Sequence, residues 1–141
     1  MVKIGIMSFA HLHANSYAAC LKALPGVSLS AIWDDNASRG KKMAKEFKTN
    51  FVKDMNEFLA SDIEGVIITS ENSKHRAMVE AAARAKKWIL CEKPLAPTMK
   101  DAQSIVTTCR KAGVGLGTAF PCRFSTPLIE AKSMLNSGKF G

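Results

Sequence analysis

The stretch KIGIMSFAHLHANSYAACLKAL, residues 3–24, decides the fold. Its apolar run up to Met7 is too short for a helix, and apolar residues then recur at helical spacing from Ala14 onward. A strand that runs into a helix in this way is typical of a dinucleotide-binding turn, but the Gly-x-Gly-x-x-Gly fingerprint of such turns is missing. In its place the chain has Ser8-Phe9-Ala10-His11-Leu12-His13.

The alternation of strand and helix continues through the chain. Pattern and turn residues predict strands at 2–7, 27–33, 51–52, 65–69, 88–91 and 114–119, with helices between them and a final helix after 126. Thr98 and Thr126 are expected to cap the helices that follow them. Right-handed crossovers then give an α/β fold, a Rossmann-type doubly wound, mainly parallel sheet flanked by helices, with its ligand crevice at the carboxyl ends of the strands.

Composition excludes several classes of protein. The 141 residues, 47% of them hydrophobic, suffice for one domain with a substantial core. The formal net charge of +8 is spread over separate segments with no interleaved aromatic residues, so we expect no nucleic-acid partner. Four cysteines without paired spacing indicate reduced thiols, and no leader or membrane-spanning segment is evident. We therefore expect a cytoplasmic protein without a membrane partner.

Asp34 follows the second predicted strand, where dinucleotide folds place an acid that binds the adenosine ribose. A carboxylate repels an additional phosphate, which favours NAD over NADP. Arg39 and Lys41 lie close enough in sequence to weaken that preference, so NADP stays an alternative. Asp34 as a cap of the following helix is the other interpretation.

The turn itself offers small residues and two histidines. Ser8 and Ala10 are the smallest replacements for the first two glycines, and free amides at the helix start would still attract phosphate. His13 stands where a third glycine lets helix and strand touch, so either the helix is displaced or Ala14 makes that contact. The spacing of His11 and His13 is expected to splay their rings apart, and no third ligand is near, so we expect no metal.

Glu92-Lys93-Pro94 follows the fifth predicted strand. A lysine at the end of a buried strand, beside the place of a nicotinamide, can donate to a substrate oxygen and help to move its proton. The alternative is a surface lysine before a turn proline. On the first interpretation Lys93 is the candidate catalytic residue.

Together these motifs resemble the amino-terminal domain of the Gfo/Idh/MocA (glucose-fructose oxidoreductase, inositol dehydrogenase) family. The resemblance extends from VKIGIMSFAHLHA through AIWDDNASRGKKMA and GVIITSENSKHRAMVEAAARAKKWILCEKPL to FPCRFSTPLIEAKSMLNSGKFG. It implies hydride transfer between NAD(P) and a sugar, polyol or similar small hydroxy or carbonyl compound. It also implies the candidate cofactor-binding residues, which are Ser8, Phe9, Ala10, His11 and Leu12 at the pyrophosphate, Asp34 at the adenosine ribose, Ser70, Asn72 and His75 on the nicotinamide side, and Glu92, Lys93 and Arg123.

The chain departs from the family in its missing glycines and in Glu71, which replaces a frequent proline. Members of the family continue into a substrate domain, whereas this sequence stops at Lys139-Phe140-Gly141. We therefore assign residues 1–120 to the dinucleotide-binding domain and 121–141 to a linker and helix leading to an absent substrate domain, so that the chain is a fragment or a shortened protein. Apolar surface left uncovered would favour a homo-oligomer.

Two other classes of function stay open. A non-catalytic NAD-binding or protein-interaction module would keep the fold without the chemistry. A phosphorylated receiver domain would need an acceptor aspartate at a strand end, for which Asp54 is the candidate.

Overall fold

A computed structural model describes residues 1–138 of the chain. Its centre is a six-stranded sheet in the order β3-β2-β1-β4-β5-β6, and every neighbouring pair of strands is parallel. The strands are β1 (Val2–Met7), β2 (Val27–Trp33), β3 (Asn50–Phe51), β4 (Gly65–Ile68), β5 (Trp88–Glu92) and β6 (Leu116–Ala119). This is the doubly wound Rossmann order, which confirms the predicted fold class.

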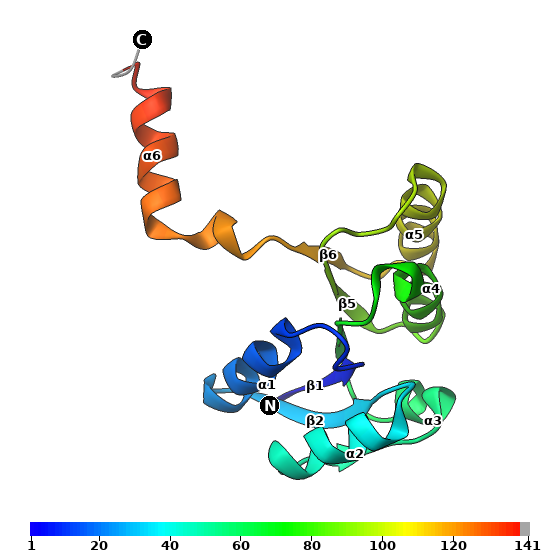
Figure 1. Cartoon of the computed structure of the whole chain (residues 1–141). Helices are drawn as coiled ribbons and strands as arrows, with labels where there is room; N and C mark the ends of the chain where they lie inside the picture. Colours follow the sequence, from blue (N-terminus) through cyan, green and yellow to red (C-terminus); the bar gives the residue numbers. More distant parts are fainter. Residues whose placement is uncertain (139–141) are drawn as a thin grey trace.

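Helices connect the strands on both faces of the sheet (Figure 1). They are α1 (His13–Ala23), α2 (Ala37–Glu46), α3 (Met55–Ala60), α4 (His75–Arg84) and α5 (Met99–Ala112), with the short 3-10 turn η1 (Asn72–Lys74) before α4. A second 3-10 turn, η2 (Pro121–Phe124), and the helix α6 (Thr126–Asn136) follow β6. The chain leaves β1 toward one edge of the sheet and β4 toward the other. The switch point of the topology, where ligands bind in such sheets, therefore lies between β1 and β4.

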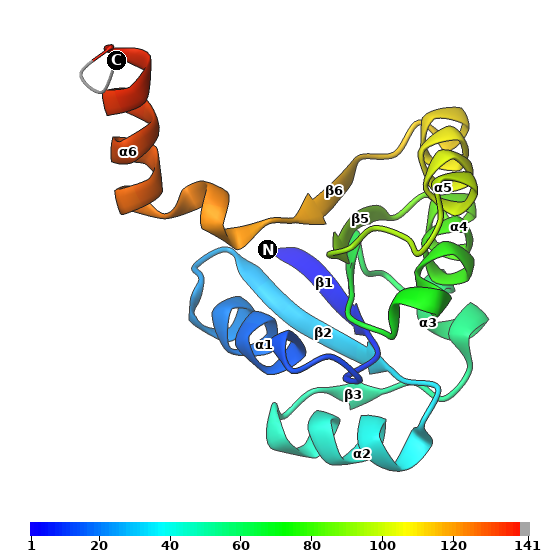
Figure 2. The ribbon, with the colours of Figure 1, turned by 45° about the horizontal axis from the view of Figure 1, so that its top comes forward.

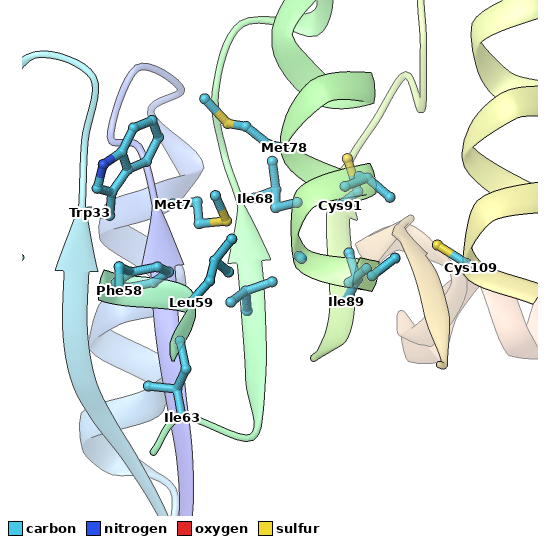
Figure 3. Packing of buried hydrophobic residues seen from close by; sticks show 14 of the residues in the cluster. Met7, Trp33, Phe58, Leu59, Ile63, Ile68, Met78, Ile89, Cys91 and Cys109 are labelled. Atoms are coloured by element: carbon cyan, nitrogen blue, oxygen red, sulfur yellow. The ribbon is translucent and has the colours of Figure 1, made fainter. Parts of the chain in front are cut away.

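Two apolar cores lie on opposite faces of the sheet. One gathers side chains of α3, α4 and α5 against the strands, and Figure 3 shows Phe58, Met78 and Ile68 in it. The other packs α1 and α2 against the strands and includes Ile6 and Ala14. Ala14 is fully buried in this core, whereas His13 is only partly buried, so of the two solutions that the sequence offered the burial favours Ala14 at the close contact of α1.

The face of the sheet on which α1 and α2 pack is not covered along its whole width. A hollow of about 460 Å³ lies over β4, β5 and β6, lined by apolar or glycine residues: Ile4, Leu21, Gly65, Val66, Ile67, Trp88, Ile89, Leu90, Gly115, Leu116 and Gly117. The last helix, α6, does not fill it, because α6 extends away from the sheet (Figures 1 and 2). Large apolar side chains of α6, among them Leu128 and Leu135, are exposed.

Most predicted boundaries agree with the structure, and the caps show where pattern reasoning failed. Thr98 accepts a hydrogen bond from the Asp101 backbone and caps α5 as expected. The prediction for Thr126 is wrong, because α6 already begins there and Ser125 occupies the capping position. Asp54 caps α3 through Asn56 and Glu57, and the strand order differs from that of a receiver domain, so that alternative is wrong.

None of the helices within residues 1–138 is both long enough and apolar enough to cross a membrane.

The contact between β1 and α3 gives a first prediction. A Cβ added at Gly5 would lie 2.4 Å from the Cζ of the fully buried Phe58 ring. We expect Gly5→Ala to lower the free energy of unfolding by about 2 kcal/mol in urea denaturation, because the ring must shift in a packed core. Gly117→Ala is the matched control: its Cβ would come no closer than 3.4 Å to Leu90. Equal losses for the two variants would contradict the packing described.

Candidate functional site

The turn after β1 adopts a glycine-like conformation without glycine. Ser8 has a φ of 76°, in the left-handed region that side chains rarely enter. It is fully buried, and hydrogen bonds hold it on both sides. Its amide donates to the Trp33 carbonyl oxygen at 2.7 Å, and its carbonyl oxygen accepts from the Thr69 hydroxyl at 2.6 Å. Neighbouring strand ends therefore impose the conformation that a glycine would adopt freely.

Asp34 holds the next residue of the turn. Its carboxylate is buried and accepts four hydrogen bonds: from the amides of Phe9 and Asn36, both at 2.8 Å, and from Nε and a terminal nitrogen of Arg39 at 2.8 and 2.7 Å. Both oxygens are thus already engaged within the chain. Asp34 does not cap α2, because Asn36 accepts from the Arg39 amide and does so instead.

Arg39 joins this carboxylate to the turn. Besides Asp34, its guanidinium donates to the Ser8 hydroxyl at 3.2 Å and to the Asp35 carboxylate at 3.0 Å. Hydrogen bonding to Asp34 raises the pKa of Arg39. The arginine side chain is partly exposed. The sequence identified Arg39 only as a neighbour of Asp34, and its role in the turn was not predicted.

The backbone amides of the turn are largely occupied, which differs from the expectation of free donors. Besides the amides of Ser8 and Phe9, that of Ala10 donates to the Ser8 hydroxyl at 3.2 Å and that of His11 to the Thr69 carbonyl at 3.0 Å. At the start of α1, the amide of His13 donates to His11 Nδ1 at 3.2 Å, and that of Ala14 to the His11 carbonyl oxygen. A bound phosphate would have to displace the Ser8 hydroxyl or the His11 ring to reach these amides.

The two histidine rings are not splayed apart, so that prediction is wrong. Their centroids lie 4.5 Å apart with an angle of 73° between the ring planes. A third group, distant in sequence, completes a cluster: the Glu92 carboxylate lies 2.8 Å from His13 Nδ1. The chain turns at His11 so that both rings face the end of β5, which spacing alone does not reveal.

Glu92 links α1 to the end of β5. Its carboxylate is almost fully buried and also accepts hydrogen bonds from the Tyr17 hydroxyl at 2.7 Å and from the Lys93 amide at 2.9 Å. Burial alone would raise the pKa of Glu92, but the hydrogen bonds from Tyr17 and His13 outweigh it and hold the pKa below its usual value. Burial and the bond to Glu92 raise the pKa of Tyr17 in turn. This contact of Tyr17 was not predicted, because Tyr17 lies on α1 and its partner lies far along the sequence on β5.

Lys93 follows directly, and its backbone is fixed by Glu92. The side chain is half-buried at the carboxyl edge of the sheet. Within residues 1–138 its amine has no hydrogen-bond or ion-pair partner. The amine is therefore available to a ligand, as the catalytic interpretation requires.

The residues predicted on the nicotinamide side are not equally accessible. Asn72 is exposed at the start of η1, whereas Ser70 is buried. His75 is fully buried, with Nδ1 3.0 Å from the Pro94 carbonyl oxygen and Nε2 3.2 Å from that of Ser70. His75 thus connects the loop after β4 to the Lys93-Pro94 turn, a positioning role rather than an open ligand surface.

Among the remaining predicted residues, too, some are exposed and others are buried. Leu12 is exposed at the start of α1, and Phe9 is buried in the α1 core, where its ring packs near Phe47. Arg123 is exposed in η2, and no hydrogen bond or ion pair joins its side chain to the other candidate residues within the described part of the chain. Of the predicted carboxy-terminal segment, Lys139, Phe140 and Gly141 lie outside the described residues.

A sheet of this order, with such a turn at its switch point, defines a Rossmann nucleotide-binding domain. The family model GFO_IDH_MocA, described as an oxidoreductase family with an NAD-binding Rossmann fold, matches residues 2–120, so the chain belongs to this family.

Individual relatives agree with this assignment. The uncharacterized oxidoreductase YrbE of Bacillus subtilis is 30% identical over 98% of this chain and 40% of its own length. Inositol 2-dehydrogenase of Salmonella typhimurium is 29% identical over 99% of this chain and 43% of its own. An Agrobacterium radiobacter oxidoreductase, solved with NAD⁺, L-tartaric acid and magnesium, superposes with a TM-score of 0.88 at 29% identity over 99% of this chain and 41% of that protein. The chain thus spans about two fifths of the length of these relatives.

The four bonds to the Asp34 carboxylate give a second prediction. We expect Asp34→Ala to lower the free energy of unfolding by about 3 kcal/mol, because the Phe9 amide loses its acceptor and Arg39 its buried partner. Asp35→Ala, at the neighbouring exposed position, is the control and should cost less than about 1 kcal/mol. Chemical denaturation measures both. If the two variants lose the same amount, Asp34 does not hold the turn.

The Glu92 carboxylate gives a third prediction, on pH. Because its pKa is lowered by folding, its contribution to stability is present above the unfolded value of about 4.3 and is lost as pH falls through the folded value. Glu92→Gln should therefore cost about 2 kcal/mol at pH 7, and the difference from wild type should shrink as the pH is lowered through this window. The measurement is urea denaturation at several pH values. Glu130→Gln on the exposed α6 should show no such trend; a difference for Glu92→Gln that is constant with pH would contradict the assignment.

Proposed function

We propose that the chain forms the NAD(P)-binding half of an oxidoreductase that transfers hydride to or from a sugar, polyol or similar small hydroxy or carbonyl compound. One observation supports this most directly. The turn after β1 contacts Asp34 through Phe9 on one side and Glu92 through His13 on the other. The candidate ribose site and the candidate substrate lysine thus flank one turn at the switch point, where an extended dinucleotide would bind.

The residues present fit a dinucleotide in part. Asp34 and the partly exposed Arg39 side chain would face the adenosine ribose. The turn from Ser8 to Leu12 would face the pyrophosphate, once the Ser8 hydroxyl and His11 ring release the amides they occupy. Asn72 and Arg123 are the exposed candidates on the nicotinamide side, with Ser70 and His75 holding the loop behind them. When bound, the nicotinamide supplies the hydride acceptor or donor. Because internal partners must be displaced, we expect weak binding.

Lys93 is proposed as the catalytic residue. Glu92 fixes its backbone, and its half-buried amine can donate a hydrogen bond to a substrate oxygen. In the oxidation direction it would help to accept the hydroxyl proton, and in the reduction direction it would return one.

The proposed substrate pocket would need residues from outside this chain. Self-association is proposed as well, through the exposed apolar surface of α6. Four free cysteines support the proposed cytoplasmic location.

Of the non-catalytic alternatives, an NAD-binding module and a protein-interaction module, the occupied amides favour the second, which keeps the fold without binding a dinucleotide. Isothermal titration calorimetry of the chain with NAD and NADP distinguishes the two candidates. Saturable binding of either dinucleotide supports the oxidoreductase half. Heats no larger than dilution for both would support the module.

Arg39 supplies a fourth prediction. Its removal takes away a cation that can face the additional phosphate of NADP and leaves the Asp34 carboxylate with fewer partners. We expect Arg39→Ala to weaken NADP binding about tenfold more than NAD binding, equivalent to about 1.4 kcal/mol. Lys45→Ala, exposed on the same helix, is the matched control and should leave the ratio unchanged. An unchanged ratio in Arg39→Ala would remove Arg39 from cofactor selection.

A further inference from the structure

Two histidines and a glutamate meet at the start of α1. His11 and Glu92 are also candidate cofactor-binding residues, but the cluster that they form with His13 has no part in the proposed hydride transfer. One ligand atom from each of His11, His13 and Glu92 lies within 4.8 Å of the others. We propose that this cluster binds a divalent transition-metal ion of the zinc class. The inference goes beyond the proposed function, since it needs no dinucleotide.

The two closest ligand atoms of the cluster, one from His13 and one from Glu92, already face each other across a shared proton. His13 Nδ1 and Glu92 Oε1 are 2.8 Å apart. An ion replacing that proton stands about 2.1 Å from each atom, which in tetrahedral geometry separates the two by about 3.4 Å. The atoms must therefore move apart by roughly 0.6 Å, a change within reach of a small rotation of the half-exposed His13 ring.

His11 completes the set at small cost. Its ring lies beside that of His13, and its only hydrogen bond through Nδ1 within the described residues is the long contact of 3.2 Å from the His13 amide. Coordination through Nδ1 would replace this contact, and coordination through Nε2 would place the ring proton on Nδ1, which then no longer accepts from the His13 amide. Either way, no strong interaction is lost.

The surroundings orient the glutamate as a metal ligand requires. Glu92 is 1% exposed, and its two oxygens are held by the Tyr17 hydroxyl and the Lys93 amide. Partners of this kind around the ligands fix their orientation in metal sites. The two histidines are only half-buried, so an ion can enter from their side.

The donor set selects the kind of ion. Two imidazoles and one carboxylate favour zinc and its neighbours over magnesium or calcium, which prefer oxygen ligands throughout. Three protein ligands also leave a fourth position for water or for an oxygen of a small ligand, as in open zinc sites.

The fifth prediction tests this site directly, in the absence of dinucleotide. Zinc is titrated into the full chain, with calorimetry for stoichiometry and NMR of the histidine rings for location. We expect one ion per chain, with the ring signals of His11 and His13 shifting and those of the buried His75 unchanged. His13→Ala should weaken binding more than tenfold, and Tyr17→Phe about tenfold through the loss of its bond to Glu92. Asn15→Ala, an exposed neighbour on α1, should bind as wild type does.

Several results would overturn the proposal: no saturation at millimolar zinc, unchanged affinity in His13→Ala, or binding that disappears in a Cys20→Ser, Cys122→Ser variant, which would place the ion on exposed thiols. Circular dichroism checks that each variant folds. The NMR measurement on the wild-type chain decides the location even where a variant does not fold. Since no dinucleotide is present, failure of NAD(P) binding leaves this result independent.

Discussion

The carboxylate of Asp34 is the constraint on which the turn at the switch point depends. By binding the Phe9 amide and the Arg39 guanidinium together, it keeps the chain after β1 against the end of β2 and lets Ser8 persist in a left-handed conformation. A glycine would adopt that conformation without support, whereas a serine needs its neighbours to compensate for the strain. The compensation uses polar groups that a cofactor would otherwise contact, so the rigidity of this turn and its affinity for phosphate oppose each other.

Much of the fold follows from local patterns. The continuous apolar run of β4 predicts a strand covered on both faces, and all four of its residues are buried. Thr98 indicates the start of a helix because its hydroxyl can accept a hydrogen bond from a backbone amide in the first helical turn, only a few residues away. The error at Thr126 has the same local origin, since Ser125 and Thr126 both suit a cap and Ser125 takes that position, without a capping hydrogen bond from its side chain.

The site was predicted less completely, because its contacts join residues distant in sequence. The positions of Asp34 and Lys93 follow from the rule that strand ends share an edge of the sheet. The hydrogen bonds from Arg39 to Asp34 depend on the direction that α2 takes after its cap at Asn36. The contact of His13 with Glu92 joins residues that are 79 positions apart in the sequence. The burial of His75 between two carbonyl oxygens likewise depends on two loops that only the folded sheet brings together.

The hollow beside α1 changes how the folded state of this protein can be monitored. Dyes such as anilinonaphthalene sulfonate fluoresce on accessible apolar surface and are used to recognise loosened, molten-globule states. Here the native chain already presents an apolar hollow of about 460 Å³. We therefore expect bright dye fluorescence from the intact protein as well. Loss of near-ultraviolet circular dichroism, which reports packed rings such as that of the buried Trp33, is the signal that marks a disordered interior.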